Sequence, residues 1–309
     1  MRTGPRRALI AAGLVAASLA ALPRLVPGPE ARVSLRGHGG GWSGIDVDAG
    51  GRRALLLNDR GRYLAATLLR EGDRLAGLAG TRDAATLGMG DEVADSEGLD
   101  AFGPATGGEI VVSFEGFARL RRFPLEDPGA PWGWIRDLPP DVAPRRNRGL
   151  EAVARDATGR AYTLAERPSA GTGAFDLMRL APDPHWHVAE WEVAARLAAD
   201  PGWWAVGADF GPDGGFHLLE RRFLGAGFSS RIRRFQPGGF GAGLRRGEVV
   251  WSPPPFRFGN LEGLALWRDA DGATRAIMVS DDNGWPVMRG ELIEILLPAA
   301  PLAEPAPAQ

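Results

Sequence analysis

A short motif recurs five times along this chain of 309 residues and constrains the fold more than any other feature. Each copy is centred on a glycine, and the intervals between copies are 54, 51, 58 and 56 residues, at Gly44, Gly98, Gly149, Gly207 and Gly263. After each glycine come a short apolar strand, a Gly-rich, Thr-Gly or Asp-Gly turn, a second apolar strand that ends at an acid, and a third strand. A unit that repeats at a nearly fixed interval is typical of propellers and solenoids.

Four antiparallel strands in each repeat predict the blade of a β-propeller. The less regular fourth strand is illustrated by 248–251, whereas the last repeat ends with its third strand at 291–297. The stretch 32–35 can supply the missing outer strand and close the ring, which removes an exposed sheet edge. We therefore predict an all-β protein, a β-propeller of five to six four-stranded blades closed by an N-terminal strand. A sixth blade would have to lie in the Pro-rich segment 124–144.

The two ends of the chain differ from the repeats. Three arginines among the first seven residues precede an uncharged, Ala-rich run at 8–22, a pattern typical of a secretory signal peptide. We expect a signal peptide or N-terminal anchor over 1–27, a propeller domain over 28–297 and a disordered Pro/Ala-rich tail over 298–309. The protein is then periplasmic or secreted, and its only membrane contact is an uncleaved N-terminal segment.

Composition excludes several classes of function. The chain has no Cys, so disulfide scaffolds, thiolate metal sites and cysteine nucleophiles are ruled out. A net charge of −2 argues against a nucleic-acid binder, which needs a basic face. The 44 Gly and 25 Pro stand beside 44% hydrophobic residues, a mixture that suits a turn-rich β-architecture with a real core. We expect a monomer that binds a small anionic or ester substrate.

Acids gather at one end of the predicted blades. The second strands of the repeats end at Asp59, Glu115, Glu166, Glu220 and Asp281. The start of one strand and the end of its hairpin partner lie at the same end of a sheet, so these acids should share a face with Glu97, Glu151 and Glu262, and with Asp46 and Asp209 as further candidates. Carboxylates around one channel mouth repel each other unless they are protonated, paired or bridged by a cation. An oxygen-ligated ion such as Ca²⁺ suits this set, because Cys is absent and His is scarce.

A structural interpretation of the same acids is also open. Several are followed directly by arginine, as in Glu166-Arg167 and Glu220-Arg221. An acid at a strand end can cap a turn or pair with an arginine of the neighbouring blade.

Three segments closely resemble motifs of the bacterial phytase-like family, whose domain is described as "esterase-like activity of phytase". They read RNRGLEA at 146–152, GNLEGLA at 259–265 and SDDN at 280–283. The resemblance spans nearly the whole mature chain and implies an exported β-propeller with hydrolase activity. By analogy with calcium-dependent propeller phytases and lactonase-like propellers, it implies that axial acids and asparagines hold Ca²⁺. In this chain those residues are Glu97, Asn147, Glu151, Glu166, Asn260, Glu262, Asp281, Asp282 and Asn283. The fourth repeat departs from the pattern, because Gly207-Ala208-Asp209 replaces the Glu-Gly-Leu form.

Two functions of different classes are consistent with these features. The first is an exported hydrolase of phosphate or carboxylic esters with Ca²⁺ at the channel mouth. In it Glu151 or Glu262 is the general base, Arg148 or Arg289 binds the substrate anion, and the remaining acids and asparagines hold the ion. The second is a non-catalytic periplasmic ligand-binding or scaffold propeller with a structural ion, since no organised set of nucleophile and base is visible.

Overall fold

The computed structural model describes residues 30–80, 85–89, 95–103, 107–116, 118–138, 149–180, 190–236, 240–241, 243–282 and 288–299. The predicted signal segment at 1–27 and most of the predicted tail at 298–309 lie outside these ranges. Within them every regular element is a β-strand, and no helix is long and apolar enough to cross a membrane.

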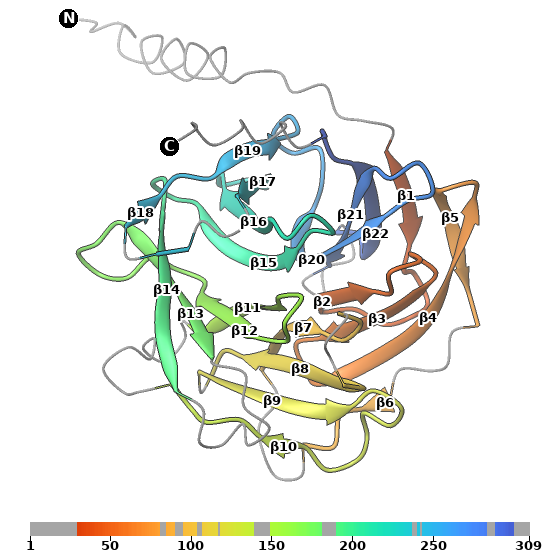
Figure 1. Ribbon diagram of the computed structural model, residues 1–309. Coiled ribbons are helices and arrows are strands. Elements are labelled where there is room, and N and C mark those ends of the chain that lie inside the picture. Colours follow the sequence, from red (N-terminus) through yellow and green to blue (C-terminus); the bar gives the residue numbers. More distant parts are fainter. Residues whose placement is uncertain are drawn as a thin grey trace, which may run out of the picture.

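The strands form five sheets around a central axis (Figure 1), and each sheet is one blade of a β-propeller. From the axis outwards, blade 1 contains β2 (Trp42–Val47), β3 (Arg53–Asn58), β4 (Arg62–Glu71) and β5 (Arg74–Ala79), with β6 (Ala85–Thr86) beside β4. Blade 2 contains β7 (Ser96–Asp100), β8 (Glu109–Phe114), β9 (Arg119–Pro124) and β10 (Gly133–Trp134). Blade 3 contains β11 (Leu150–Arg155), β12 (Ala161–Ala165), β13 (Ala174–Leu180) and β14 (Trp191–Ala198), with β18 (Leu244–Arg245) at its outer edge.

Blades 4 and 5 complete the ring. Blade 4 contains β15 (Trp204–Phe210), β16 (Phe216–Phe223), β17 (Phe228–Phe235) and β19 (Glu248–Trp251). Blade 5 contains β20 (Asn260–Arg268), β21 (Thr274–Asp281), β22 (Glu291–Leu296) and, as its outer strand, β1 (Ala31–Ser34). Neighbouring strands pair antiparallel throughout, except that β18 pairs parallel with β14.

The N-terminal strand closes the propeller as predicted. In blade 5, β1 pairs antiparallel with β22, so that Val33 lies opposite Leu292. The described part of the Pro-rich segment 124–144 forms β10, which pairs with β9 as the outer strand of blade 2. The described residues therefore form five blades, and the alternative of a sixth blade in that segment is not realised in its described part.

The hydrophobic core is divided among the contacts between blades. The five clusters of buried apolar side chains each combine residues of two adjacent blades: Trp42 and Trp267 belong to the cluster between blades 1 and 5, and Phe175 and Phe216 to the one between blades 3 and 4. The inner strands are consequently buried on both faces, which explains their nearly continuous apolar sequences. Burial of each large side chain contributes roughly 1.5–3 kcal/mol.

The first hairpin of each blade turns where the sequence predicts. In blade 3, the carboxylate of Asp156 accepts hydrogen bonds from the backbone N–H groups of Thr158 (2.9 Å) and Arg160 (3.1 Å). Gly159 occupies the left-handed region in this turn, at φ 84°, which a residue with a Cβ rarely adopts. Each turn returns the second strand to the end of the channel at which the first strand begins.

Candidate functional site

The inner strands approach each other closely at a bulge near the start of each strand. A Cβ added at Gly98 would lie 2.9 Å from the carbonyl oxygen of Glu151, and one added at Gly263 would lie 2.7 Å from the backbone nitrogen of Ile45. The repeated glycine therefore lets the backbones of adjacent blades meet around the axis. The register shift at the bulge, for example between Ala205 and Gly207, is present in all five inner strands.

The register corrects one assignment made from the sequence. The sequence predicts Gly149 as the repeat glycine of blade 3, but strand pairing places Ala152 at the position that glycine fills elsewhere. The equivalent positions are then separated by 54, 54, 55 and 56 residues, at Gly44, Gly98, Ala152, Gly207 and Gly263. The prediction was wrong because a search for glycine alone passes over an alanine in the same place.

Two sets of equivalent residues surround the channel mouth. The first, called here the inner ring, precedes the repeat glycine or its alanine and consists of Ser43, Glu97, Glu151, Val206 and Glu262. The second, called here the outer ring, follows the residue of the second strand that pairs just before the bulge, and consists of Asp59, Glu115, Glu166, Arg221 and Asp281. Four of the five outer-ring residues are acids, and in blade 4 an arginine takes the acid's place.

The expected position of Glu220 in the mouth is therefore wrong. Glu220 lies opposite Ala205 in the ladder and is fully buried within blade 4, where its carboxylate accepts hydrogen bonds from Arg231 (2.7 Å) and Arg233 (2.7 Å). Successive side chains of a strand point to opposite faces, so a shift of one residue exchanges the two. Arg221, the next residue, is the one that reaches the mouth.

Three glutamates in blades 2 and 3 form the densest group of acids. Glu97, Glu115 and Glu151, called here the glutamate triad, each contribute one carboxylate oxygen to a group in which these three atoms lie within 4.8 Å of one another. Burial raises the pKa of each carboxyl, and so do neighbouring acids: Glu151 acts on Glu97, while Glu166 acts on both Glu115 and Glu151. The pKa values of Glu97 and Glu151 lie well above the usual range. None of the described residues donates a hydrogen bond to these carboxylates or forms an ion pair with them.

The other side of the mouth is organised around Arg221. Its Nη1 donates to Asn260 Oδ1 (2.5 Å) and to Glu262 Oε1, and its Nη2 lies 3.4 Å from Glu166 Oε1. The amide of Asn260 donates in turn to Glu262 Oε1 (2.7 Å). Burial raises the pKa of Glu262 to about 7, although Arg221 and Asn260 both favour its charged form. The neighbouring acids raise the pKa of Arg221, which stays a cation.

The sequence also placed Asp46 and Asp209 as candidates at the mouth, and the structure places them at the far ends of the inner strands. There Asp46 accepts hydrogen bonds from the backbone of Ala101 (2.6 Å) and Phe102 (2.8 Å), and Asp209 accepts one from Leu266 (2.6 Å). Asp46 thus accepts from the segment just after the inner strand of the next blade, and Asp209 accepts from the inner strand of the next blade itself. Burial raises the pKa of Asp46 to about 7 and that of Asp209 well above its usual range. Asp46 therefore connects blades 1 and 2, and Asp209 connects blades 4 and 5.

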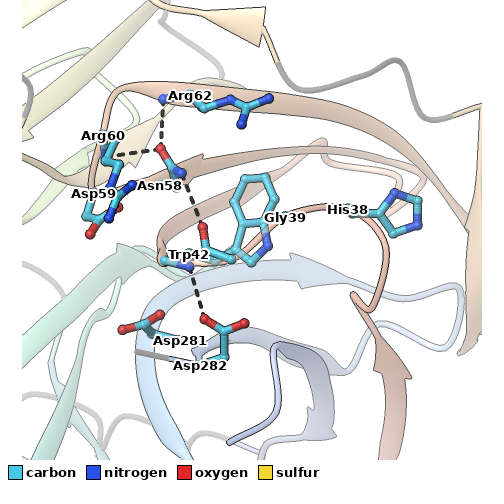
Figure 2. A pocket seen from close by; sticks show the side chains of 11 residues that line it. His38, Gly39, Trp42, Asn58, Asp59, Arg60, Arg62, Asp281 and Asp282 are labelled. Carbon is cyan, nitrogen blue, oxygen red and sulfur yellow. Dashed lines mark hydrogen bonds and ion pairs between the residues drawn. The ribbon is translucent and has the colours of Figure 1, made fainter. Parts of the chain in front are cut away.

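A polar pocket of about 560 Å³ lies beside the mouth between blades 1 and 5 (Figure 2). Its floor is held by Asn58, whose side chain donates to Gly40 O (3.2 Å) and accepts from the backbone of Arg60 (3.1 Å) and Arg62 (2.8 Å). Asp282 accepts from the backbone of Gly41 (3.4 Å), on the opposite wall. Because the pocket is open and continues from the outer ring, it gives a small polar molecule access to the mouth.

The structure brings together most of the described residues that the sequence singled out. Glu97 and Glu151 belong to the triad, and Glu166, Asn260 and Glu262 contact Arg221. Two more acids lie next to these groups, since Asp281 raises the pKa of Glu262 and Asp282 lines the polar pocket. Arg289 is exposed and lines a different pocket, between blades 4 and 5. Asn147, Arg148 and Asn283 lie outside the described residues.

Sequence reasoning left two residues out of the candidate site. Glu115 was recognised as a strand-end acid but not as a member of the ligand set, and Arg221 was considered only as a structural partner. Aligning the ends of the second strands by hairpin register, instead of by the nearest acid, would have placed both in the outer ring.

Comparisons with known proteins agree with this architecture. The family model described as "Esterase-like activity of phytase" matches residues 38–284. A thermostable family-43 glycoside hydrolase superposes with a TM-score of 0.50 at 9% identity, over 84% of this chain and 90% of that one. A calcium structure of a Trichoderma reesei family AA12 carbohydrate-active enzyme gives a TM-score of 0.43 at 12% identity, over 81% and 80% of the two chains. At such identities the glycoside hydrolase shares the fold alone.

No curated protein matches the chain. The family match, in contrast, extends from the segment before β2 to the segment after β21 and thus includes both rings of the mouth. A match over most of the chain, on a five-bladed propeller whose mouth carries the motif residues, shows that the chain belongs to the phytase-like family.

Proposed function

We propose that the protein is a hydrolase of phosphate or carboxylic esters that uses a divalent cation, Ca²⁺, at the channel mouth. The observation that carries this proposal is the glutamate triad, in which one carboxylate oxygen of each residue lies within 4.8 Å of the other two. Ligands on opposite sides of a calcium ion lie about 4.8 Å apart, because each Ca–O distance is about 2.4 Å. Three glutamate carboxylates at this spacing fit Ca²⁺, and a site made of oxygen ligands alone favours such a hard cation over softer metals.

Charge supports the same assignment. The mouth holds five glutamates of the two rings, and the described cations that contact any of them are Arg221 and the more exposed Arg167. Arg221 engages Glu166 and Glu262, so the triad keeps its repulsion. A bound divalent ion would remove that repulsion and would favour the ionised form of all three carboxyls.

In this proposal Glu97, Glu115 and Glu151 hold the ion and Glu262 is the general base. Glu262 is oriented by Asn260 and Arg221, as a base needs to be if it is to meet an incoming water in one geometry. When bound, Ca²⁺ would polarise the ester oxygen and lower the pKa of a water ligand. Glu262 would accept a proton from the attacking water, and the polar pocket beside Asp282 would admit the ester. The description of the family as esterase-like supports an ester as substrate.

A non-catalytic ligand-binding or scaffold propeller is the second candidate, and one observation favours it. The carboxylate proposed as base already accepts hydrogen bonds from both Arg221 and Asn260, which suits a structural role.

We also propose that the protein is exported as a monomer. Sequencing the N-terminus of protein recovered from outside the cytoplasm tests the signal, because an intact residue 1 would contradict cleavage.

The test is ester hydrolysis by purified, chelator-treated protein with and without Ca²⁺, using p-nitrophenyl phosphate and p-nitrophenyl butyrate. Glu262→Gln should lower kcat by about 10²-fold or more and leave Ca²⁺ affinity within about twofold. Glu151→Gln should instead lower Ca²⁺ affinity by about tenfold or more. The control is Glu248→Gln, because Glu248 is exposed at the start of β19.

The outcomes separate the candidates. Ca²⁺ binding without turnover of either ester would replace the hydrolase by the scaffold. If the wild type bound no divalent ion, the metal site itself would be abandoned.

A further inference from the structure

A second pocket opens on the mouth face between blades 4 and 5, and its chemistry differs from that of the mouth. Its volume is about 800 Å³, and its walls include four phenylalanines, Phe223, Phe228, Phe256 and Phe258. Phe223 is 52% exposed and Phe256 is 57% exposed, which makes them, with Trp134, the most exposed aromatic residues that the structure describes. We call this cavity the phenylalanine pocket. Exposed rings gathered around a cavity are a common mark of a binding site.

The backbone of Phe256 is held in an unfavourable conformation. Among the described residues it alone, apart from glycines, has a positive φ, of 64°. The N–H of Arg257 donates to the carbonyl of Pro254 (3.3 Å), so Phe256 occupies the third position of a tight turn after Pro255. Glycine normally fills that position when φ is positive, because a side chain there clashes with the backbone.

The ring of Phe256 does not offset this strain by burial. It is 57% exposed, and it lies against the Gly225–Gly227 hairpin tip, where a Cβ added at Gly227 would come within 2.8 Å of the ring. The turn is also fixed in place, since the N–H of Phe256 donates to the carbonyl of Phe228 (2.9 Å). A strained residue that presents an exposed ring into a cavity points to a contact with a ligand.

The charges around the pocket favour an anion. Arg32 and Arg257 both pair with Glu30, and Arg257 does so through Nε (3.0 Å) and Nη2 (2.7 Å). Arg32 Nη1 also lies 3.7 Å from Glu291. Arg289 is exposed on the pocket wall, and within the described residues its guanidinium has no hydrogen bond or ion pair. Three arginines against two glutamates leave a net charge of +1, and Arg289, although its charge acts on Glu291, is the arginine that forms no ion pair with either glutamate.

We propose that the phenylalanine pocket binds a small anion with a flat aromatic body, such as an arenecarboxylate or an aryl phosphate. The aromatic body would pack between Phe223 and Phe256, in the edge or offset geometry that rings prefer, and the anionic group would pair with Arg289. The pocket shares a wall with the mouth, because the ring of Phe228 lies 5.8 Å from the guanidinium of Arg221. Binding in the pocket needs neither the cation nor Glu262, so it goes beyond the proposed hydrolysis.

The test is titration of the full chain with 2-naphthoate by calorimetry, in the presence of a chelator. We expect one molecule bound per chain, with binding of the uncharged 2-naphthylmethanol weaker by about tenfold and no binding of acetate. Phe256→Gly should weaken 2-naphthoate by about tenfold or more and should not lower Tm, because glycine relieves the strained φ. Arg289→Gln should weaken the binding of 2-naphthoate and leave the affinity for 2-naphthylmethanol unchanged.

Matched controls lie elsewhere on the surface. Leu244→Ala removes an exposed apolar side chain from β18, and Arg268→Gln removes an exposed cation at the end of β20. Both should leave 2-naphthoate affinity unchanged.

Three results would overturn the proposal. The first is unchanged 2-naphthoate affinity in Phe256→Gly. The second is loss of that affinity in Glu151→Gln, which would place the ligand at the mouth. The third is binding to phosphatidylglycerol vesicles without binding of 2-naphthoate, which would make the exposed rings a contact with lipid.

Discussion

The two sides of the channel mouth use equivalent positions for opposite charges. In blades 2 and 3 the outer ring supplies Glu115 and Glu166, whereas in blade 4 it supplies Arg221. The glutamate triad has no cation among its described contacts, while Arg221 binds Glu166 and Glu262 directly. Arg221 thus neutralises part of the negative charge of Glu166 and Glu262, which is the effect that a bound ion would have on the glutamate triad. One residue in the outer ring thus separates the acids that have an internal cation from those for which we propose a bound metal ion.

Removal of the Arg221 guanidinium should have the largest effect on the stability of the protein. Arg221→Met leaves Glu166 and Glu262 buried without their partner, and we expect the free energy of unfolding to fall by about 3–5 kcal/mol. The measurement is chemical denaturation without added metal. Arg167→Met is the control, because Arg167 is 41% exposed and its pair with Glu166 should contribute about 1 kcal/mol or less. If the free energy of unfolding fell equally in the two variants, Arg221 would stabilise the mouth no more than an exposed arginine does.

Removal of one triad carboxylate should have the opposite effect on the metal-free protein. Glu151→Gln relieves repulsion within the triad, so the free energy of unfolding should rise by about 1 kcal/mol or more without Ca²⁺. The same variant should lose most of the stabilisation that Ca²⁺ gives to the wild type. Thermal melting with and without the ion measures both. A variant less stable than the wild type in chelator would contradict mutual repulsion.

The response to Ca²⁺ should weaken in acid. Burial and repulsion raise the pKa values of Glu97 and Glu151, so both hold protons well above the usual carboxyl range and the ion must displace them. In the metal-free protein the same shift makes stability fall as pH rises through the folded pKa values. We therefore expect a large rise in Tm with Ca²⁺ at about pH 7.5 and little at about pH 5. The double variant Glu97→Gln/Glu151→Gln should respond to Ca²⁺ at neither pH.

The smallest effect is expected where the outer ring meets solvent. Asp59 occupies the same ring position as Glu115, but its side chain is 51% exposed. Asp59→Asn should change the free energy of unfolding by less than about 1 kcal/mol and Ca²⁺ affinity by less than about twofold. Glu115→Gln should reduce that affinity by about tenfold. Equal effects in a titration with Ca²⁺ would place the ion elsewhere in the mouth.

The features that the sequence predicts correctly are those set by local chemistry. Short apolar runs and the Asp-Gly or Gly-Gly turns between them identify the hairpins, and the regular interval identifies the blades. The stretch 32–35 was assigned to ring closure because the last repeat lacked an outer strand, and β1 confirms that assignment. The acids at Glu97, Glu151 and Glu262 follow from the same hairpin logic.

The errors come from shifts of one to three residues that sequence alone does not resolve. Glu220 and Arg221 are both polar, so the pattern does not show which of them faces the mouth; the bulge between Ala205 and Gly207 decides it. Ala152 occupies in blade 3 the position after the bulge that glycine fills in the other blades. The repeat glycine predicted from the sequence, Gly149, therefore lies three residues too early. The contact of Arg221 with Glu262 joins two blades, and no local pattern encodes it.

The pairing of β1 with β22 has a consequence for the order in which the molecule forms. Ala31 lies opposite Glu294, so the contact that completes the ring joins the two ends of the described chain. Contacts between such distant residues form late and slowly, because the intervening loop must first be ordered. A growing chain can assemble its first four blades in sequence, but its first strand has no partner until the last one has been made. Closure of the propeller therefore has to wait until β22 has been synthesised.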